Sequence, residues 1–246
     1  MERQIIPNGA DQFNSIHDKL IARWREIGAN GHLHLTGLYE NPEDAVTLNY
    51  LEDTARQAGL QTTSLEIESI GVDGTSQFVD LDDRRIELAF KLYPWEWMLR
   101  DSFGSRIRTA TTRWIEPPWK VVLSNKGILP LLWEMFPNHP NLLPAYFEDD
   151  AEVGRLGSSY VRKPIYSREG ANVELVCDGT ALERQSGPYG SEGFVRQAFA
   201  PLPSFEGMYP VIGSWIVGDQ TCGLSIREDA NPITGNTSRF LPHAIL

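Results

Sequence analysis

Cysteine, basic residues and long apolar runs are scarce in this 246-residue chain. Cys177 and Cys222 are too few for a disulfide framework and lack the paired spacing of a zinc site, so we interpret them as reduced core residues on strands. Twenty-two basic against 33 acidic side chains leave a formal charge of −11, which argues against nucleic acid or an anionic membrane as a partner. No run approaches the ~18 apolar residues of a membrane helix, and the first residues lack a signal-peptide pattern. We therefore expect a cytoplasmic protein.

The first part of the chain has the pattern of an α/β layer. Apolar residues recur every three or four positions over 11–27, with Asp11 as the expected N-cap and Gly28 as the end of the helix. The segments that follow have the short connections of a parallel crossover unit. They are a strand over 32–38, a helix that begins at Asn41-Pro42 and ends at Gly59, a strand over 62–67, and a strand over 86–92 whose alternation predicts one buried face.

The second part has the pattern of antiparallel sheets. Apart from an apolar helix over 128–136, with Ser124 as a possible cap, it contains short strands at 160–166, 173–177, 194–199, 209–217 and 221–227, with turns at Asp178-Gly179 and Gly218-Asp219. Pro117-Pro118 interrupts the pattern, so we place a boundary there and expect domains over 1–113 and 114–246.

Lys163 lies in a strand-like run and is followed by the polar turn 167–172 and another strand. A lysine in an apolar strand is costly to bury unless an anion meets it, and the turn could place backbone N–H groups over a polyphosphate. With a single glycine the motif is weak, and on its pattern alone we favour a lysine that extends from an edge strand above an ordinary hairpin.

Two further cations are candidates for the same chemistry. Lys126 precedes the apolar helix, where most lysines only decorate the helix start. Arg227 ends an apolar strand and could stabilise charge on a transferred phosphoryl group, although pairing with the adjacent Glu228-Asp229 is the plainer interpretation.

Glu96 stands between two tryptophans, an arrangement that could hold an ammonium ion by charge and cation–π attraction. From the residues alone we prefer two core tryptophans beside a solvated glutamate. The five histidines show only one alternating pair on a strand, which is a weak metal signal. A Walker-type loop, a dinucleotide glycine fingerprint and a Gly-x-Ser-x-Gly motif are absent from the sequence.

The order of these pieces resembles the synthetase domain of the glutathionylspermidine synthase family. The resemblance covers essentially the whole chain and is closest to stand-alone members without the fused amidase domain. It is carried by segments at 116–120, 124–133, 160–172, 212–215 and 225–229. It implies an ATP-grasp-like α+β / α/β fold, in which a small Rossmann-like layer precedes antiparallel ATP-grasp subdomains.

The resemblance also implies a reaction and its residues. ATP would phosphorylate a carboxylate, glutathione or another peptide, and a polyamine-like amine would displace the phosphate to form an amide. Positioning and charge neutralisation are the main tasks of the protein in such a reaction. By resemblance, Arg227 lies near the phosphoryl-transfer centre and Glu96 in the amine site. The ATP-binding residues would be Lys126 and Lys163, the loop of Ser167, Arg168, Glu169, Gly170, Ala171 and Asn172, and the adenine segment of Arg196, Gln197, Ala198 and Phe199.

Two elements of the family pattern are not found in this sequence. They would supply the Mg²⁺ ligands and an arginine near the carboxylate, and Glu228-Asp229-Ala230-Asn231 does not replace them in spacing. We therefore expect no metal ligand in this chain, and a partial chain whose preceding segment supplies Mg²⁺ binding. A non-catalytic nucleotide- or polyamine-binding protein and a structural fragment are the alternatives.

Overall fold

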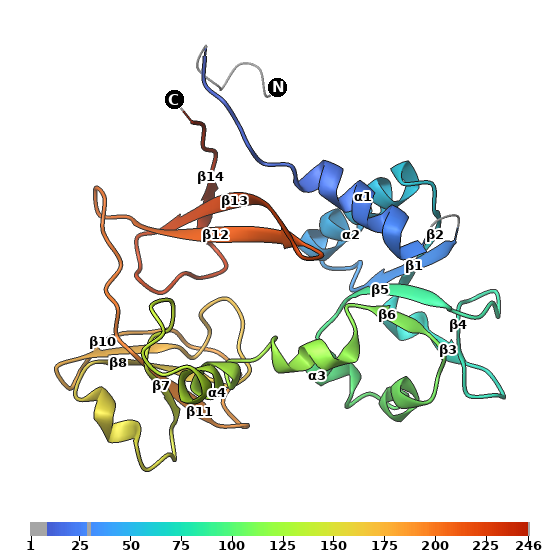
Figure 1. The fold of residues 1–246 in the computed structure, drawn as a ribbon. Helices are drawn as coiled ribbons and strands as arrows, with labels where there is room; N and C mark the ends of the chain where they lie inside the picture. The colour runs from blue at the N-terminus through green and yellow to red at the C-terminus, as the bar shows by residue number, and fades with distance from the viewer. Residues whose placement is uncertain (1–8, 29–30, 246) are drawn as a thin grey trace. The chain divides into compact units, whose positions relative to one another are not determined.

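A computed structural model describes residues 9–28 and 31–245 of the chain (Figure 1). The chain divides into two compact units. We call Phe13–Val121 with Trp215–Gly223 the parallel-sheet unit, and the described parts of Met1–Gln12, Val122–Ser214 and Leu224–Leu246 the antiparallel-sheet unit. A parallel sheet combined with antiparallel sheets confirms the predicted α/β and α+β fold class.

The parallel-sheet unit is built on a four-stranded sheet in the order β2-β1-β5-β6. All neighbouring pairs are parallel, and Leu33 lies opposite Thr62 in the β1–β2 register. The predicted crossover is confirmed, because a helix joins β1 to β2. The bounds are β1 His32–Gly37, α2 Pro42–Gln57, β2 Gln61–Glu66, β5 Leu88–Leu92 and β6 Arg113–Ile115.

Asn41 caps α2 as predicted. Its Oδ1 accepts hydrogen bonds from the backbone N–H groups of Glu43 at 2.9 Å and Asp44 at 3.4 Å, and Pro42 occupies the first turn. Pro42 suits this position because the first N–H groups of a helix have no partner within the helix.

The first helix, α1 (Ile16–Gly28), begins five residues later than predicted. Asp11 is therefore not its N-cap. The backbone of Asp11 exchanges hydrogen bonds with that of Ile245, at 2.8 and 2.9 Å. This pairing with the end of the chain holds Asp11 extended, and no local pattern revealed it. The predicted end at Gly28 is confirmed.

Both faces of the parallel sheet are covered. Leu33 and Leu35 of β1 pack with Trp24 of α1 and Leu48 of α2 on one face. The other face is covered by a second apolar cluster that includes Phe78 and Trp114. The prediction of one buried face for β5 is therefore wrong, since crossover connections place cover on both sides of a parallel sheet. The elements on this second side are η2 Ile67–Ser69, β3 Gly71–Val72, β4 Phe78–Val79, α3 Trp95–Met98, η3 Gly104–Arg108 and η4 Pro118–Val122.

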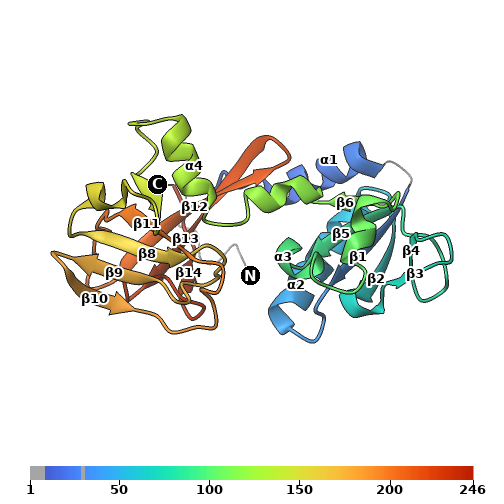
Figure 2. The same cartoon turned by 90° about the horizontal axis from the view of Figure 1, so that it is seen from below.

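The antiparallel-sheet unit contains a five-stranded sheet in the order β10-β9-β8-β11-β7 (Figure 2). Three predicted strands are confirmed as β8, β9 and β11. The two missed strands are β7, which has three residues, and β10, whose sequence is weakly patterned. Helix α4 packs against β7 and β11. The bounds are α4 Ile128–Met135, β7 Ala145–Phe147, η5 Val153–Leu156, β8 Tyr160–Pro164, β9 Glu174–Cys177, β10 Thr180–Arg184 and β11 Phe194–Ala198.

Ser124 does not cap α4. The N-cap is Gly127, whose N–H donates to Asn125 Oδ1 at 2.9 Å. The side chain of Asn125 therefore shapes this turn.

A three-stranded sheet in the order β12-β13-β14 completes the fold. β12 (Tyr209–Val217) and β13 (Gln220–Asp229) are joined at the predicted turn Gly218-Asp219, where Gly218 has φ +67°. β14 (Arg239–Leu241) was not predicted. Both cysteines are free and lie on strands, as expected, but the prediction of a core position is confirmed for Cys222 alone, since Cys177 is partly exposed. Within the described residues, the helices are too short or too polar to cross a membrane.

Candidate functional site

The loop between β8 and β9 is the centre of the candidate site. Three of its residues have positive φ: Glu169 at +52°, Gly170 at +73° and Asn172 at +56°. Glycine and asparagine adopt this conformation at low cost, which explains why the loop contains both. The Ala171 N–H donates to Arg168 O at 2.9 Å. Successive tight turns of this kind can direct backbone N–H groups toward an anion.

Lys126 reaches this loop from the segment before α4. Its Nζ donates to the backbone oxygen of Ser167 at 2.8 Å and to Ser167 Oγ at 2.7 Å. The backbone N–H of Lys126 also donates to Ile165 O at 2.9 Å. The structure therefore ties together two segments that are 41 residues apart in the sequence.

Lys163 lies on β8, an interior strand of the sheet between β9 and β11 rather than an edge strand. Its Nζ donates to Gln197 Oε1 on β11 at 2.7 Å. The expectation of an edge-strand lysine extending to solvent is wrong, and burial lowers the pKa of Lys163 below its usual range. An interior position leaves the ammonium with fewer water molecules than a surface lysine has.

The cations of this loop repel one another. Burial, followed by the charges of Lys163 and Arg168, lowers the pKa of Lys126 to about 8. The hydrogen bonds of both lysines go to neutral oxygens, and among the described residues neither lysine has a carboxylate partner. A cluster of this kind favours a bound anion, because the anion would relieve both the burial and the repulsion.

Close packing fixes the position of the loop. A Cβ added at Gly170 would lie 2.8 Å from Thr234 O and 2.8 Å from Ile233 Cγ2. Two residues further along the loop, Asn172 Oδ1 accepts from the Tyr189 N–H at 2.8 Å. The loop is therefore held between two segments that follow it in the chain, and Gly170 has no space for a side chain.

Arg227 lies on β13 beside the segment that packs on Gly170. Its Nη2 donates to Gly235 O at 2.9 Å, its Cζ lies 5.0 Å from the Phe240 ring centroid, and its Nε is buried without a hydrogen-bond partner. The plainer interpretation, pairing with Glu228-Asp229, is not what the structure shows. Glu228 pairs with Arg239, and Asp229 accepts from Ser238 Oγ at 2.5 Å.

The four residues expected to read adenine lie at β11 and just beyond it. The backbone of Arg196 and Gln197 is paired on both sides, by β8 and by β7. The Ala198 N–H donates to Pro144 O at 2.8 Å, and Phe199 packs on the small apolar cluster under the loop. Because the backbone of Arg196 and Gln197 is already paired, β11 could contact a nucleotide base only from its end.

Glu148 is a site neighbour that the sequence interpretation missed. Its carboxylate accepts from Arg162 at 2.6 and 2.6 Å and from Arg196 at 2.9 and 3.1 Å. The Arg162 hydrogen bond, more than that of Arg196, lowers the pKa of this carboxyl below its usual range. The charge of Arg196 is therefore directed at a side chain of the protein. A single glutamate after β7 carries no sequence signal for this role.

Glu96 lies in α3, in the other unit, with 8% of its surface exposed. Trp95 is buried and Trp97 is 37% exposed. The Glu96 side chain is therefore neither an open carboxylate between two indole rings nor a solvated glutamate, so neither interpretation of the sequence matches its position. Its role in amine binding stays a prediction.

The described residues contain no group of three or more histidine, cysteine, aspartate or glutamate side chains that could hold a metal ion. The paired histidines of β1 are engaged otherwise: His32 stacks on His34 at 4.7 Å, and His34 Nε2 lies 3.2 Å from Asp80. The described residues therefore offer no ligand set that fits Mg²⁺.

The family model and the similar proteins indicate the same family. The model of the glutathionylspermidine synthase pre-ATP-grasp family matches residues 1–246, the whole chain. A protein of Haemophilus influenzae named "putative acid–amine ligase" is 45% identical over 244 residues, which is 95% of this chain and 62% of that protein.

Two less similar relatives are named as synthetases. Trypanothione synthetase of Crithidia fasciculata is 29% identical over 92% of this chain and 38% of its own length. The bifunctional glutathionylspermidine synthetase/amidase of Escherichia coli is 27% identical over 96% of this chain and 42% of its own length. The chain thus spans between about two fifths and three fifths of these three relatives.

Proposed function

The chain belongs to the glutathionylspermidine synthase family, and on that premise we propose that it acts as an ATP-dependent ligase that joins a carboxylate to an amine in the cytoplasm. A carboxylate oxygen attacks the γ-phosphorus of ATP and ADP leaves. The amine nitrogen then attacks the acyl carbon, phosphate leaves, and the nitrogen loses a proton to give the amide. Glutathione or another peptide is the proposed carboxylate, and a polyamine-like molecule is the proposed amine.

The observation that carries this proposal is that Lys126, which binds Ser167 of the 167–172 loop, lies close enough to Lys163 to feel its charge. Among the described residues neither lysine has a carboxylate partner. Two partly buried ammonium groups and a tightly turned loop suit the phosphates of ATP. In this assignment Lys126 and Lys163 bind the phosphates, because a polyphosphate restores the charge balance that burial and repulsion disturb.

Arg227 is assigned to the transferred phosphoryl group. Its guanidinium is fixed by Gly235 O and the Phe240 ring, and its Nε has no partner. A held cation with an unused donor can stabilise charge that develops during transfer without reorganising. The adenine is assigned to the end of β11, at Ala198 and Phe199.

The second candidate function is nucleotide binding without turnover. It is favoured by the lack of a three-carboxylate cluster within the described residues. ATP would then bind through the same lysines, and no ADP would form whether or not glutathione and spermidine are added.

Calorimetric titration with ATP tests the proposal, using Lys163→Met and, as a matched control, Lys120→Met. Lys120 makes a surface ion pair with Glu116 at 2.9 Å and lies outside the cluster. We expect Lys163→Met to weaken ATP binding roughly tenfold to a hundredfold, since a charge-assisted contact contributes about 1.5–3 kcal/mol. The control should leave the affinity unchanged.

Equal affinities for both variants would remove Lys163 from the site and contradict the proposal. Where ATP binds, ADP formation with glutathione and spermidine, present together and singly, separates the two candidates. Repeated turnover only when both are present supports the ligase, because without the amine the acyl phosphate is not converted to the amide. No ADP under any condition supports binding without turnover.

A further inference from the structure

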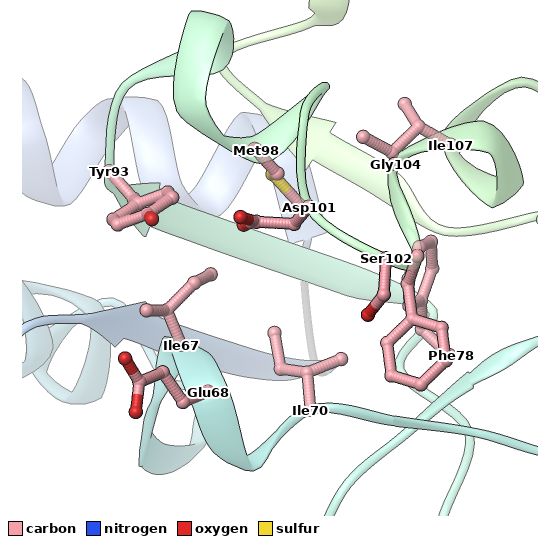
Figure 3. Close-up of a pocket in the computed structure, with 11 residues that line it drawn as sticks. Ile67, Glu68, Ile70, Phe78, Tyr93, Met98, Asp101, Ser102, Gly104 and Ile107 are labelled. Atoms are coloured by element: carbon pink, nitrogen blue, oxygen red, sulfur yellow. The ribbon is translucent and has the colours of Figure 1, made fainter.

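A cavity of about 270 Å³ lies in the parallel-sheet unit, beside the residues that follow β2 and β5 (Figure 3). Its floor is apolar and buried, formed by Ile70, Phe78, Met98 and Ile107. Ligands of open parallel sheets bind beyond the carboxyl ends of the strands, which is where this cavity lies. Its volume is at the low end for ligand pockets and suits a small molecule.

The open side of the cavity is acidic. Glu68 and Asp101 both line it, both are exposed, and the lining residues include no lysine or arginine. Among the described residues neither carboxylate has a basic side-chain partner. Lys91 lies two residues before Tyr93, but its Nζ is held 4.1 Å from the Trp95 ring centroid and donates to Tyr93 O at 2.8 Å.

Tyr93 links the acidic side to the apolar floor. Its ring packs edge-on against Trp97, with centroids 5.6 Å apart, so its orientation is fixed. Burial, followed by the charges of Asp101 and Glu68, raises the pKa of Tyr93. The field of both carboxylates therefore reaches one point in the cavity. In Figure 3, Glu68 and Tyr93 lie toward one side of the view and Phe78 toward the other.

We propose that this cavity binds a primary alkylammonium ion, with its hydrocarbon chain on Ile70 and Phe78 and its charged nitrogen between Glu68 and Asp101. An alkylamine is protonated at neutral pH, as the lysine side chain is, with a pKa of about 10.4. The apolar floor contributes by burial of the chain, the carboxylates by charge, and the Tyr93 ring by cation–π attraction. A carboxylate or phosphate ligand would be repelled by the same rim.

The cavity does not include Glu96, so the proposal assigns amine binding to residues that the sequence interpretation did not identify. Identifying the bound amine with the amine substrate of the ligase rests on the proposed function. The binding itself does not depend on ATP.

Calorimetric titration with n-pentylamine and with 1-pentanol tests the proposal, because the two molecules match in shape and differ in charge. We expect the amine to bind at least about tenfold more tightly than the alcohol. Asp101→Asn and Glu68→Gln should each lower the affinity for the amine about threefold to tenfold and change the affinity for the alcohol little. Both side chains are exposed, so the thermal midpoint of each variant should match that of the wild type.

Asp82→Asn is the control, since Asp82 is a surface carboxylate of the same unit, is 68% exposed and lies outside the cavity. Its affinity for pentylamine should equal that of the wild type. Methyl NMR signals of Ile70 and Ile107 should shift on addition of the amine, which places the ligand at the floor.

Three results would overturn the proposal. Equal affinities for alcohol and amine would leave an apolar cavity only. An equal loss in Asp82→Asn would indicate unspecific attraction to a chain of charge −11. Unchanged Ile70 and Ile107 methyl signals would place any binding elsewhere. Lys163→Met should leave pentylamine affinity unchanged, so failure of the ATP site and failure of the amine site are distinguishable.

Discussion

The two units of the chain present opposite charge environments and differ in how their interiors are filled. In the antiparallel-sheet unit, burial and then the neighbouring cations lower the pKa of Lys126 to about 8. In the parallel-sheet unit, burial and neighbouring carboxylates raise the pKa of Tyr93. A net charge of −11 therefore does not describe either site. In both proposals the local grouping of charges, rather than the net charge, decides which ligand a unit attracts.

The two units also differ in the size of their buried apolar clusters. The parallel-sheet unit has two apolar clusters, one on each face of its sheet. Among the described residues, the cluster under the 167–172 loop has three buried members: Val173, Leu175 and Ile233. The cationic site thus packs on a small apolar cluster, and we expect polar contacts such as the Glu148 pairs to take a larger share in holding it.

The largest expected effect comes from a matched pair of core substitutions. Leu35 is fully buried in the parallel sheet, and Leu175 is 6% exposed in the small apolar cluster. We expect Leu35→Ala to lower the free energy of unfolding by about 3–5 kcal/mol and Leu175→Ala by about 2–3 kcal/mol, because a denser environment collapses less around a cavity. Urea unfolding measures both.

Tryptophan fluorescence assigns each loss to its unit. Six of the seven tryptophans lie in the parallel-sheet unit, Trp133 being the exception. If the units unfold separately, Leu35→Ala moves the fluorescence transition, whereas Leu175→Ala moves only part of the far-UV circular dichroism transition. An equal shift of both signals in both variants would show that the units unfold together and that the contrast between cores has no energetic meaning.

A smaller effect is expected from Glu148→Gln, which weakens the polar contacts of the antiparallel-sheet unit. The carboxylate accepts from two arginines and is 28% exposed, so we expect a loss of about 1–2 kcal/mol at pH 7, measured by urea unfolding. Because the folded pKa of Glu148 is lowered, its contribution is complete above its ordinary pKa, about 4.3. It disappears as the pH falls through the folded pKa.

Glu152→Gln is the matched control for Glu148. Glu152 pairs with Arg155, and the two side chains are 49% and 71% exposed. Its replacement should cost less than about 0.5 kcal/mol. A loss in Glu152→Gln as large as in Glu148→Gln would contradict a special role for the Glu148 pairs.

The smallest expected effect is the pH dependence of ATP binding. With a pKa of about 8, Lys126 loses its charge above pH 8, so ATP affinity should fall by up to about tenfold between pH 8 and 9. The sign for folding is opposite. The unfolded chain binds more protons between pH 8 and the ordinary lysine pKa, so stability attributable to this group rises over that range.

Lys126→Arg sharpens this test, because arginine stays charged throughout. Its ATP affinity should be nearly independent of pH from 7 to 9. Calorimetric titration at several pH values measures both proteins. A wild-type profile as flat as that of Lys126→Arg would contradict the lowered pKa.

Local patterns predicted elements where neighbouring residues are sufficient. Asn41-Pro42 specifies a helix start because the cap and the first-turn proline act within three residues, and the crossover from β1 to β2 follows from short connections. Patterns failed where a distant partner intervenes. Asp11 pairs with Ile245, and β7 gains its place only by pairing with β11.

In the candidate site, too, local patterns predicted some features and distant contacts decided the others. The identities of Lys126, Lys163 and Arg227 came from the order of motifs along the chain, and the site assignment itself stays a prediction. That Lys163 lies inside a sheet, that Glu148 draws Arg162 and Arg196 together, and that Glu96 is buried could not be read from their neighbours. Burial and charge depend on residues far apart in the sequence.

The sequence by itself determined the family, the fold class and the residues that are candidates for chemistry, because each depends on residue types and on spacing along the chain. Only the tertiary structure decided which candidates meet. It brought Lys126 to Ser167 across 41 residues and set Glu68 and Asp101 beside one apolar cavity. The physical reason is that pKa values and ligand sites arise from desolvation and Coulomb interactions over a few ångströms, and folding rather than chain order determines those distances.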